Sequence, residues 1–149
     1  MNAKEVAILL RATARQINEN RPAEVMTIAQ ELKTLVQLRV QTRGEDYSGQ
    51  QFESYTPGTK RQREKKGFQT NYVDLTQTGR LWGNIRPSIT ESGSSFTTVS
   101  VGAQTELNKI KLGSFVKKRP NPLLPNEQEI NLVNEANRRR LQKHLNNLQ

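Results

Sequence analysis

The sequence contains little of what catalysis or metal binding requires. Among its 149 residues there is no cysteine, a single histidine (His144) and two aspartates (Asp46 and Asp74). The lack of cysteine excludes disulfides and cysteine-based metal sites, and one histidine is too few for most transition-metal sites. No HExxH, GxSxG, P-loop or GxGxxG pattern occurs. We therefore expect no enzymatic activity, no cofactor and no metal.

Apolar residues are also scarce. They make up 33% of the chain, while Asn and Gln contribute 13 residues each. Such a composition indicates a small core with long loops that partners help to order. The chain has no apolar run of about 18 residues and no signal-type apolar segment. We therefore expect neither a membrane span nor a membrane partner.

Positive charge is the property in excess. The chain has 23 Lys and Arg against 14 Asp and Glu, a net charge of +9. This excess is compatible with a nucleic-acid partner, with an acidic protein partner, or with an ordinary solvated basic surface. The run KRQREKK at 60–66 concentrates five of these cations.

Helical periodicity dominates the first part of the chain. Apolar residues repeat at helical spacing over 3–17, and again from Pro22 to just before Gly44. The sequence therefore predicts two helices within about 3–43. They either form a hairpin within the chain or pack against a neighbouring subunit.

The next segment, about 44–72, shows no regular period. It is rich in Gly, Ser, Pro and Gln, and it contains the basic run. A loop of this length in a small domain is usually functional or disordered. Phe52 and Tyr55 are its expected anchors, and the basic run is expected either to remain solvated or to meet phosphates or acidic side chains.

Short elements fill the rest of the chain. A strand at 71–76, a short helix capped by Thr78 and ended by Pro87, and a β-hairpin around Gly93 are predicted. Helices follow at 104–112, stopped by Gly113, and at about 126–147, capped by Asn126. The prediction is one α+β domain of residues 1–149. It has a small antiparallel sheet at about 73–118, packed by the N-terminal helical pair and the C-terminal helix, with a long extended loop.

The stretch VDLTQTGRLWGNI (73–85) contains the single tryptophan but no nucleophile, base or metal ligand. We interpret it as a structural joint. The expected strand enters the sheet, the chain reverses at Thr78–Gly79, and the apolar side chains that follow turn inward. The residues assigned to this joint are Thr76, Thr78, Gly79, Leu81 and Trp82. A plain core corner of any α+β fold predicts the same burial.

The order of several short motifs resembles the virion morphogenesis family of tailed bacteriophages, which comprises tail-completion and head–tail joining proteins. The motifs are YSGQQFESYTPGTKRQREKKG (47–67), VDLTQTGRLWGNI, NKIKLG (108–113) and KRPNPLL (118–124), separated by the hairpin and followed by a helix. The resemblance covers roughly 20–145. Asn121 and Pro122 depart from the family pattern, as does Trp82, where a smaller residue is common.

The resemblance implies a structural protein of the virion neck or tail, assembled in the host cytoplasm. It implies a homo-oligomeric ring of six or twelve copies that bridges portal or adaptor and tail proteins, with non-specific contact to genomic DNA in the channel. The alternative is a small cytosolic nucleic-acid-binding protein. The candidate contacts with neighbouring subunits or channel DNA are Phe52, Tyr55, Lys60, Arg61, Arg63, Lys65, Lys66, Lys117, Lys118 and Arg119.

Overall fold

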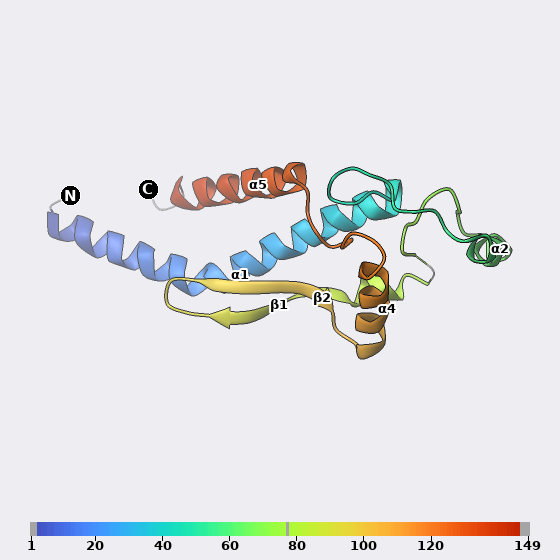
Figure 1. Cartoon of the computed structure of the whole chain (residues 1–149). Helices are drawn as coiled ribbons and strands as arrows, with labels where there is room; N and C mark the ends of the chain where they lie inside the picture. The colour runs from blue at the N-terminus through green and yellow to red at the C-terminus, as the bar shows by residue number, and fades with distance from the viewer. Residues whose placement is uncertain (1–2, 77, 147–149) are drawn as a thin grey trace.

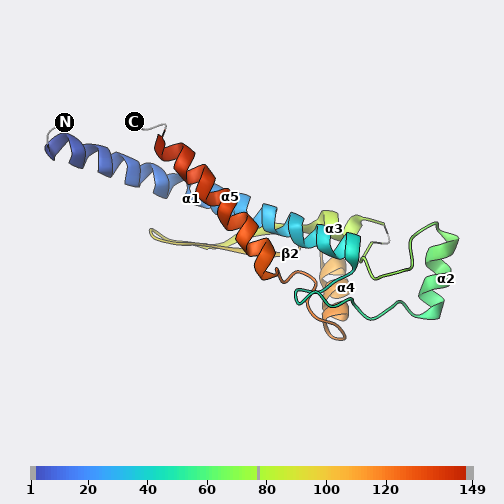
Figure 2. The same cartoon turned by 90° about the horizontal axis from the view of Figure 1, so that it is seen from above.

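The computed structural model describes residues 3–76 and 78–146. They form an α+β fold, as predicted, with a two-stranded antiparallel sheet between a long N-terminal helix and a C-terminal helix. The molecule is elongated (Figures 1 and 2). The two termini lie at one end and a short helix, α2, projects at the other. The elements are α1 (Ala3–Arg43), α2 (Pro57–Lys65), α3 (Arg80–Asn84), β1 (Ile85–Ser92), β2 (Thr97–Ala103), α4 (Glu106–Val116) and α5 (Glu127–Asn146).

The prediction of an N-terminal helical pair is wrong. Residues 3–43 form one continuous helix of 41 residues with Pro22 in its interior. A proline inside a helix removes one backbone hydrogen bond and tends to bend the axis. Figure 1 shows such a bend where the helix passes from dark to lighter blue. Next to it, Arg21 Nη1 donates to the carbonyl oxygen of Ser94 at the hairpin turn, 3.0 Å away.

The β-hairpin is confirmed. It pairs β1 with β2 from Ile85 opposite Ala103 to Ser92 opposite Thr97, with a bulge between Ile89 and Glu91. Pro87 lies in β1, although it was expected to end the preceding helix. A proline is tolerated there because both strands of a two-stranded sheet are edge strands.

A small core gathers where the C-terminal half of α1 meets the base of the hairpin. Trp82 of α3 and Ile85 of β1 are almost fully buried, with 2% and 1% of their surface exposed. Val40 of α1, Phe52, Val73 and Ala103 complete the cluster. Each buried side chain of this size contributes about 1.5–3 kcal/mol relative to full exposure. The core therefore lies next to the joint, and most of the molecule's length extends away from it.

The segment 44–72 is not structureless, as was expected, because α2 forms within it. Thr56 caps this helix, with its Oγ1 accepting the backbone N–H of Thr59, and Pro57 occupies the first turn. A threonine followed by proline is a typical helix start. The basic run therefore lies largely on a helix.

No strand forms at 71–76, which is a second correction. The Oδ1 atom of Asp74 accepts the backbone N–H of Thr76 at 2.8 Å, and Leu75 adopts a left-handed φ of +54°. An aspartate that binds the backbone two residues ahead favours a turn over an extended strand. The chain therefore bends here rather than joining the sheet.

Two further helix boundaries were predicted. Gly113 was expected to stop a helix at 104–112, but α4 continues to Val116. The extra turn carries Phe115, whose ring meets Phe52 edge-on with centroids 5.2 Å apart. The contact with the core offsets the cost of a glycine in a helix.

The start of α5 agrees with its prediction. Asn126 and Glu129 form a reciprocal capping box, in which Asn126 Oδ1 accepts from the Glu129 N–H at 2.8 Å and Glu129 Oε2 accepts from the Asn126 N–H at 2.9 Å. Glu129 also pairs with buried Arg39 of α1 at 2.8 Å. The same carboxylate thus starts α5 and fixes it to α1.

Candidate functional site

Helix α2 presents most of the predicted basic run to solvent. Arg61, Lys65 and Lys66 are exposed and Lys60 is half-buried. The helix lies at the end of the molecule farthest from the termini, clear of the hairpin and α5 (Figures 1 and 2). These four cations form a charged tip, hereafter the α2 tip.

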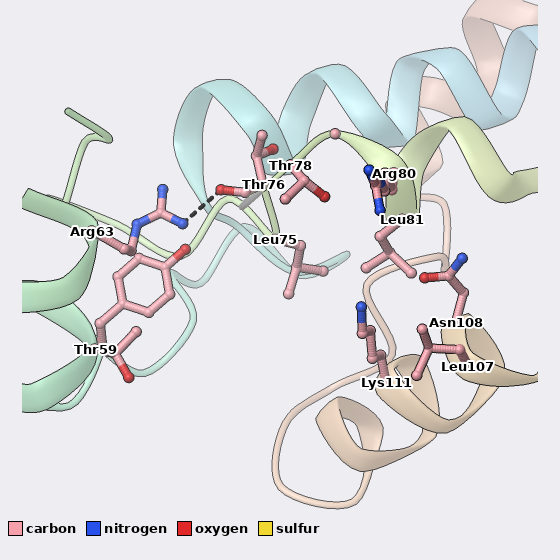
Figure 3. Close-up of a pocket in the computed structure, with 12 residues that line it drawn as sticks. Thr59, Arg63, Leu75, Thr76, Thr78, Arg80, Leu81, Leu107, Asn108 and Lys111 are labelled. Atoms are coloured by element: carbon pink, nitrogen blue, oxygen red, sulfur yellow. Dashed lines mark hydrogen bonds between the residues drawn. The ribbon is translucent and has the colours of Figure 1, made fainter. Parts of the chain in front are cut away.

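Arg63 does not belong to that tip, which corrects its assignment as a contact residue. It is 4% exposed, and its Nη2 lies 3.0 Å from Asp74 Oδ2. Its Nε donates to the Gln69 carbonyl at 2.9 Å and its Nη1 to the Thr76 carbonyl at 2.6 Å, the latter drawn in Figure 3. The guanidinium also lies over the Tyr55 ring, 4.6 Å from its centroid. Arg63 therefore fixes α2 to the joint.

Asp74 is the acceptor at the centre of this network. Besides Arg63, it receives hydrogen bonds from Gln69 Nε2 at 2.7 Å and from the Tyr55 hydroxyl at 2.9 Å. Burial raises the pKa of Tyr55 to about 12, so the phenol stays protonated and remains a donor at any ordinary pH. Tyr55, a predicted contact residue, thus has a structural role through its hydroxyl.

Phe52 is likewise an internal anchor and not a free contact, since it is 6% exposed within the core cluster. Its ring packs on Phe115, and the guanidinium of Arg119 lies 5.2 Å from the centroid of the same Phe115 ring. Arg119 Nη2 donates to the Glu53 carbonyl at 3.4 Å. Of the predicted cations near α4, Lys117 and Lys118 are exposed and Arg119 is half-buried.

The joint residues lie mostly as predicted. Trp82 is buried and its Nε1 donates to the Asp74 carbonyl at 3.2 Å, while Leu81 packs against the core cluster. The helix α3 is capped by Gly79, with a φ of +72°, rather than by Thr78, which is exposed. Thr76 accepts a hydrogen bond from Gln41 of α1 at 2.9 Å. The joint thus connects α1, α2 and α3.

A hollow of about 370 Å³ opens between α2, the joint and α4 (Figure 3). Arg80 and Lys111 contribute positive charge, and Leu75, Leu81 and Leu107 contribute apolar surface. No carboxylate occurs among the described residues that line it. This lining suits an acidic side chain accompanied by an apolar one, and it lacks the paired acid and base that hydrolytic chemistry uses.

Sequence reasoning missed a set of exposed apolar side chains. On α4, Leu107 and Ile110 are exposed, while the buried side carries Asn108, and Phe115 packs inward. On the α1–α5 side, Leu38 and Leu132 are exposed. The sequence carried a signal for α4, because its apolar residues fall on two sides of the helix, and a single core can bury one of them.

Neither models of known protein families, nor curated proteins, nor solved structures give a significant match to this chain. Within residues 3–76 and 78–146, no helix is long and apolar enough to cross a bilayer. Across that same part of the chain, no group of three or more Asp, Glu or His side chains is placed to hold a metal ion.

Proposed function

We propose that this chain is a structural subunit of the neck or tail of a tailed phage virion, which forms a ring and joins neighbouring components without enzymatic turnover. The observation that carries the proposal is the exposure of apolar side chains on two separate parts of an elongated subunit, α4 and the α1–α5 pair. Monomeric proteins rarely expose large contiguous apolar patches, whereas assembly subunits present them to partners. The order of sequence motifs supports the same role.

The proposed ring has six or twelve copies and bridges portal or adaptor and tail proteins. A ring needs two different contact surfaces on each subunit, so that each copy contacts the next in the same way. The decisive experiment is native mass spectrometry of the assembled complex, combined with its localisation in intact virions by cryo-electron microscopy. A strictly monomeric protein that is absent from virions would exclude this function.

The α2 tip is proposed as a contact to a neighbouring ring. Reversing Lys60, Arg61 and Lys65 to Glu should block particle joining, because close charge pairs at interfaces are sensitive to loss of one partner. Arg63 is left intact because it is buried. In vitro head–tail joining is the measurement, with circular dichroism to verify folding.

The matched control for this reversal is Arg138, Arg139 and Lys143 changed to Glu on the exposed side of α5. It changes the net charge by the same amount at a different place. If both triple variants join particles equally well, the α2 tip has no specific role in assembly.

A second candidate function, binding of nucleic acid, is favoured by the exposed cations of the α2 tip and of α4. We expect the isolated chain to bind duplex DNA weakly and without sequence preference. The logarithm of the affinity should then fall with the logarithm of salt concentration, with a slope near −0.9 for each phosphate contacted. Fluorescence anisotropy with two unrelated duplexes measures this. Tight, sequence-specific binding at physiological salt would favour the nucleic-acid-binding function over the neck.

A further inference from the structure

Helix α4 carries two exposed apolar side chains one turn apart. Leu107 is 63% exposed and Ile110 is 58% exposed. Residues three apart in a helix lie on the same side, so the two form one protruding apolar ridge. Lys109 and Lys111 flank this ridge with positive charge. Burying the ridge would remove apolar area from water at about 25 cal/mol per Å².

A groove with complementary properties runs between α1 and α5. A hollow of about 340 Å³ is lined by Leu35, Thr34, Leu132, Val133 and Ala136, with Gln30 and Glu31 at α1. A second hollow of about 370 Å³ shares Leu35 and Leu132 with the first and extends to Leu38. Leu38 is 58% exposed and Leu132 is 50% exposed. The groove therefore offers an apolar floor long enough for a short helix.

The charges of the two surfaces are opposite. From Glu127 to Ala136, α5 carries three glutamates and no lysine or arginine. Glu127 and Glu135 of this part are exposed. The ridge on α4 adjoins the hollow that contains Arg80 and Lys111 but no carboxylate among its described lining residues. An acidic, apolar groove and a basic, apolar ridge thus occur in the same chain.

The two surfaces do not meet within one subunit. In Figures 1 and 2, α5 lies on one side of α1 and α4 lies on the other, beyond the hairpin. A ridge on one side and a matching groove on another produce a head-to-tail contact between copies. Repeating such a contact closes a ring when the rotation between neighbours permits.

We propose that α4 of one subunit docks through Leu107 and Ile110 into the α1–α5 groove of the next copy of the same chain. This is helix-in-groove recognition, in which residues at helical spacing act as anchors. The acidic half of α5 faces the cations around α4 across the contact. This inference rests on the proposed ring and identifies the interface that builds it.

Because the chain has no cysteine, introduced thiols report this contact without background. The double variant Ile110→Cys with Leu132→Cys is treated with a short bis-maleimide and separated under denaturing conditions. A head-to-tail contact should yield a ladder of covalent multimers. A mixture of the two single variants should instead stop at a one-to-one dimer, because each subunit then offers one reactive surface.

The matched control is Ile89→Cys with Leu132→Cys, which moves the first thiol to another exposed apolar position, 44% exposed on β1. It should give no ladder. The interface is wrong if the control forms the same ladder. It is also wrong if each single variant cross-links to itself while the mixture gives no mixed dimer, since that pattern indicates a symmetric dimer.

A second pair of variants separates this interface from the ring itself. Leu107→Asp with Ile110→Asp should reduce the multimer fraction in native mass spectrometry at least tenfold, whereas Ile89→Asp should leave it unchanged. If the unmodified chain forms rings that survive the ridge substitutions, the interface proposal fails and the ring stands. If the unmodified chain forms no multimer and the cysteine pair gives no ladder, the proposed function and this interface both fail.

Discussion

Replacing Arg63 with alanine is expected to destabilise the fold by about 3–5 kcal/mol, the typical cost of removing one partner from a buried ion pair. Both partners are buried, with 5% and 9% of the Arg63 and Asp74 side chains exposed. The substitution leaves the Asp74 carboxylate without its cation, and it frees the carbonyls of Gln69 and Thr76 that Arg63 holds. Urea denaturation followed by circular dichroism measures the change in midpoint.

Arg61→Ala is the matched control, because Arg61 lies on the same helix but is exposed. A surface substitution of this kind usually changes stability by no more than about 0.5 kcal/mol. Equal midpoints for the two variants would show that the Arg63 network contributes nothing to folding. The double variant of Arg63→Ala with Asp74→Asn should be more stable than the sum of the two single changes predicts, because it no longer buries a lone charge.

This network explains why the α2 tip has a defined position despite the length of the segment around it. Arg63 is the inward side of a helix whose other cations face solvent. The sequence could not reveal this division, because a run of charged residues normally indicates a solvated surface. The partner, Asp74, lies outside the run, and nothing in local spacing connects the two.

Local signals predicted some of the fold well. Asn126 followed by Glu129 identifies the start of α5, because the capping box depends on four adjacent residues. The hairpin around Gly93 follows from alternating Thr, Val and Ser on both sides of a turn. These elements succeed because their determinants lie within a few residues of each other.

Long-range packing decided the elements that the sequence did not predict. Pro22 indicates a helix start by local rules, yet α1 continues through it. Gly113 indicates a helix end, yet Phe115 continues α4 onto the core. The pairing of Arg39 with Glu129 joins residues far apart in the chain. The same limit applies to the proposed interface, because exposure of Leu107 and Ile110 depends on which side of α4 the core occupies.

Truncating Trp82 is the other substitution with a large expected effect. Trp82→Ala should cost about 3–5 kcal/mol, as large-to-small changes in a core do. Trp82 is 2% exposed, packs in the central cluster and donates its Nε1 hydrogen to the Asp74 carbonyl. The substitution therefore leaves a cavity and an unpaired carbonyl beside the Arg63 network. Thermal unfolding by circular dichroism is the appropriate measurement, since the variant lacks the chain's single tryptophan fluorophore.

Two comparison variants give this prediction its sharpness. Trp82→Phe keeps an aromatic ring but loses the hydrogen bond, so it should destabilise less than Trp82→Ala. Phe96→Ala truncates an aromatic residue that is 46% exposed at the hairpin turn, and it should leave the Tm nearly unchanged. If Trp82→Ala also leaves the Tm unchanged, the joint does not depend on Trp82, and the stretch 73–85 has another role. A Tm loss that follows the order Ala, then Phe, with Phe96→Ala near the parent would establish Trp82 as the residue that holds the joint to the core.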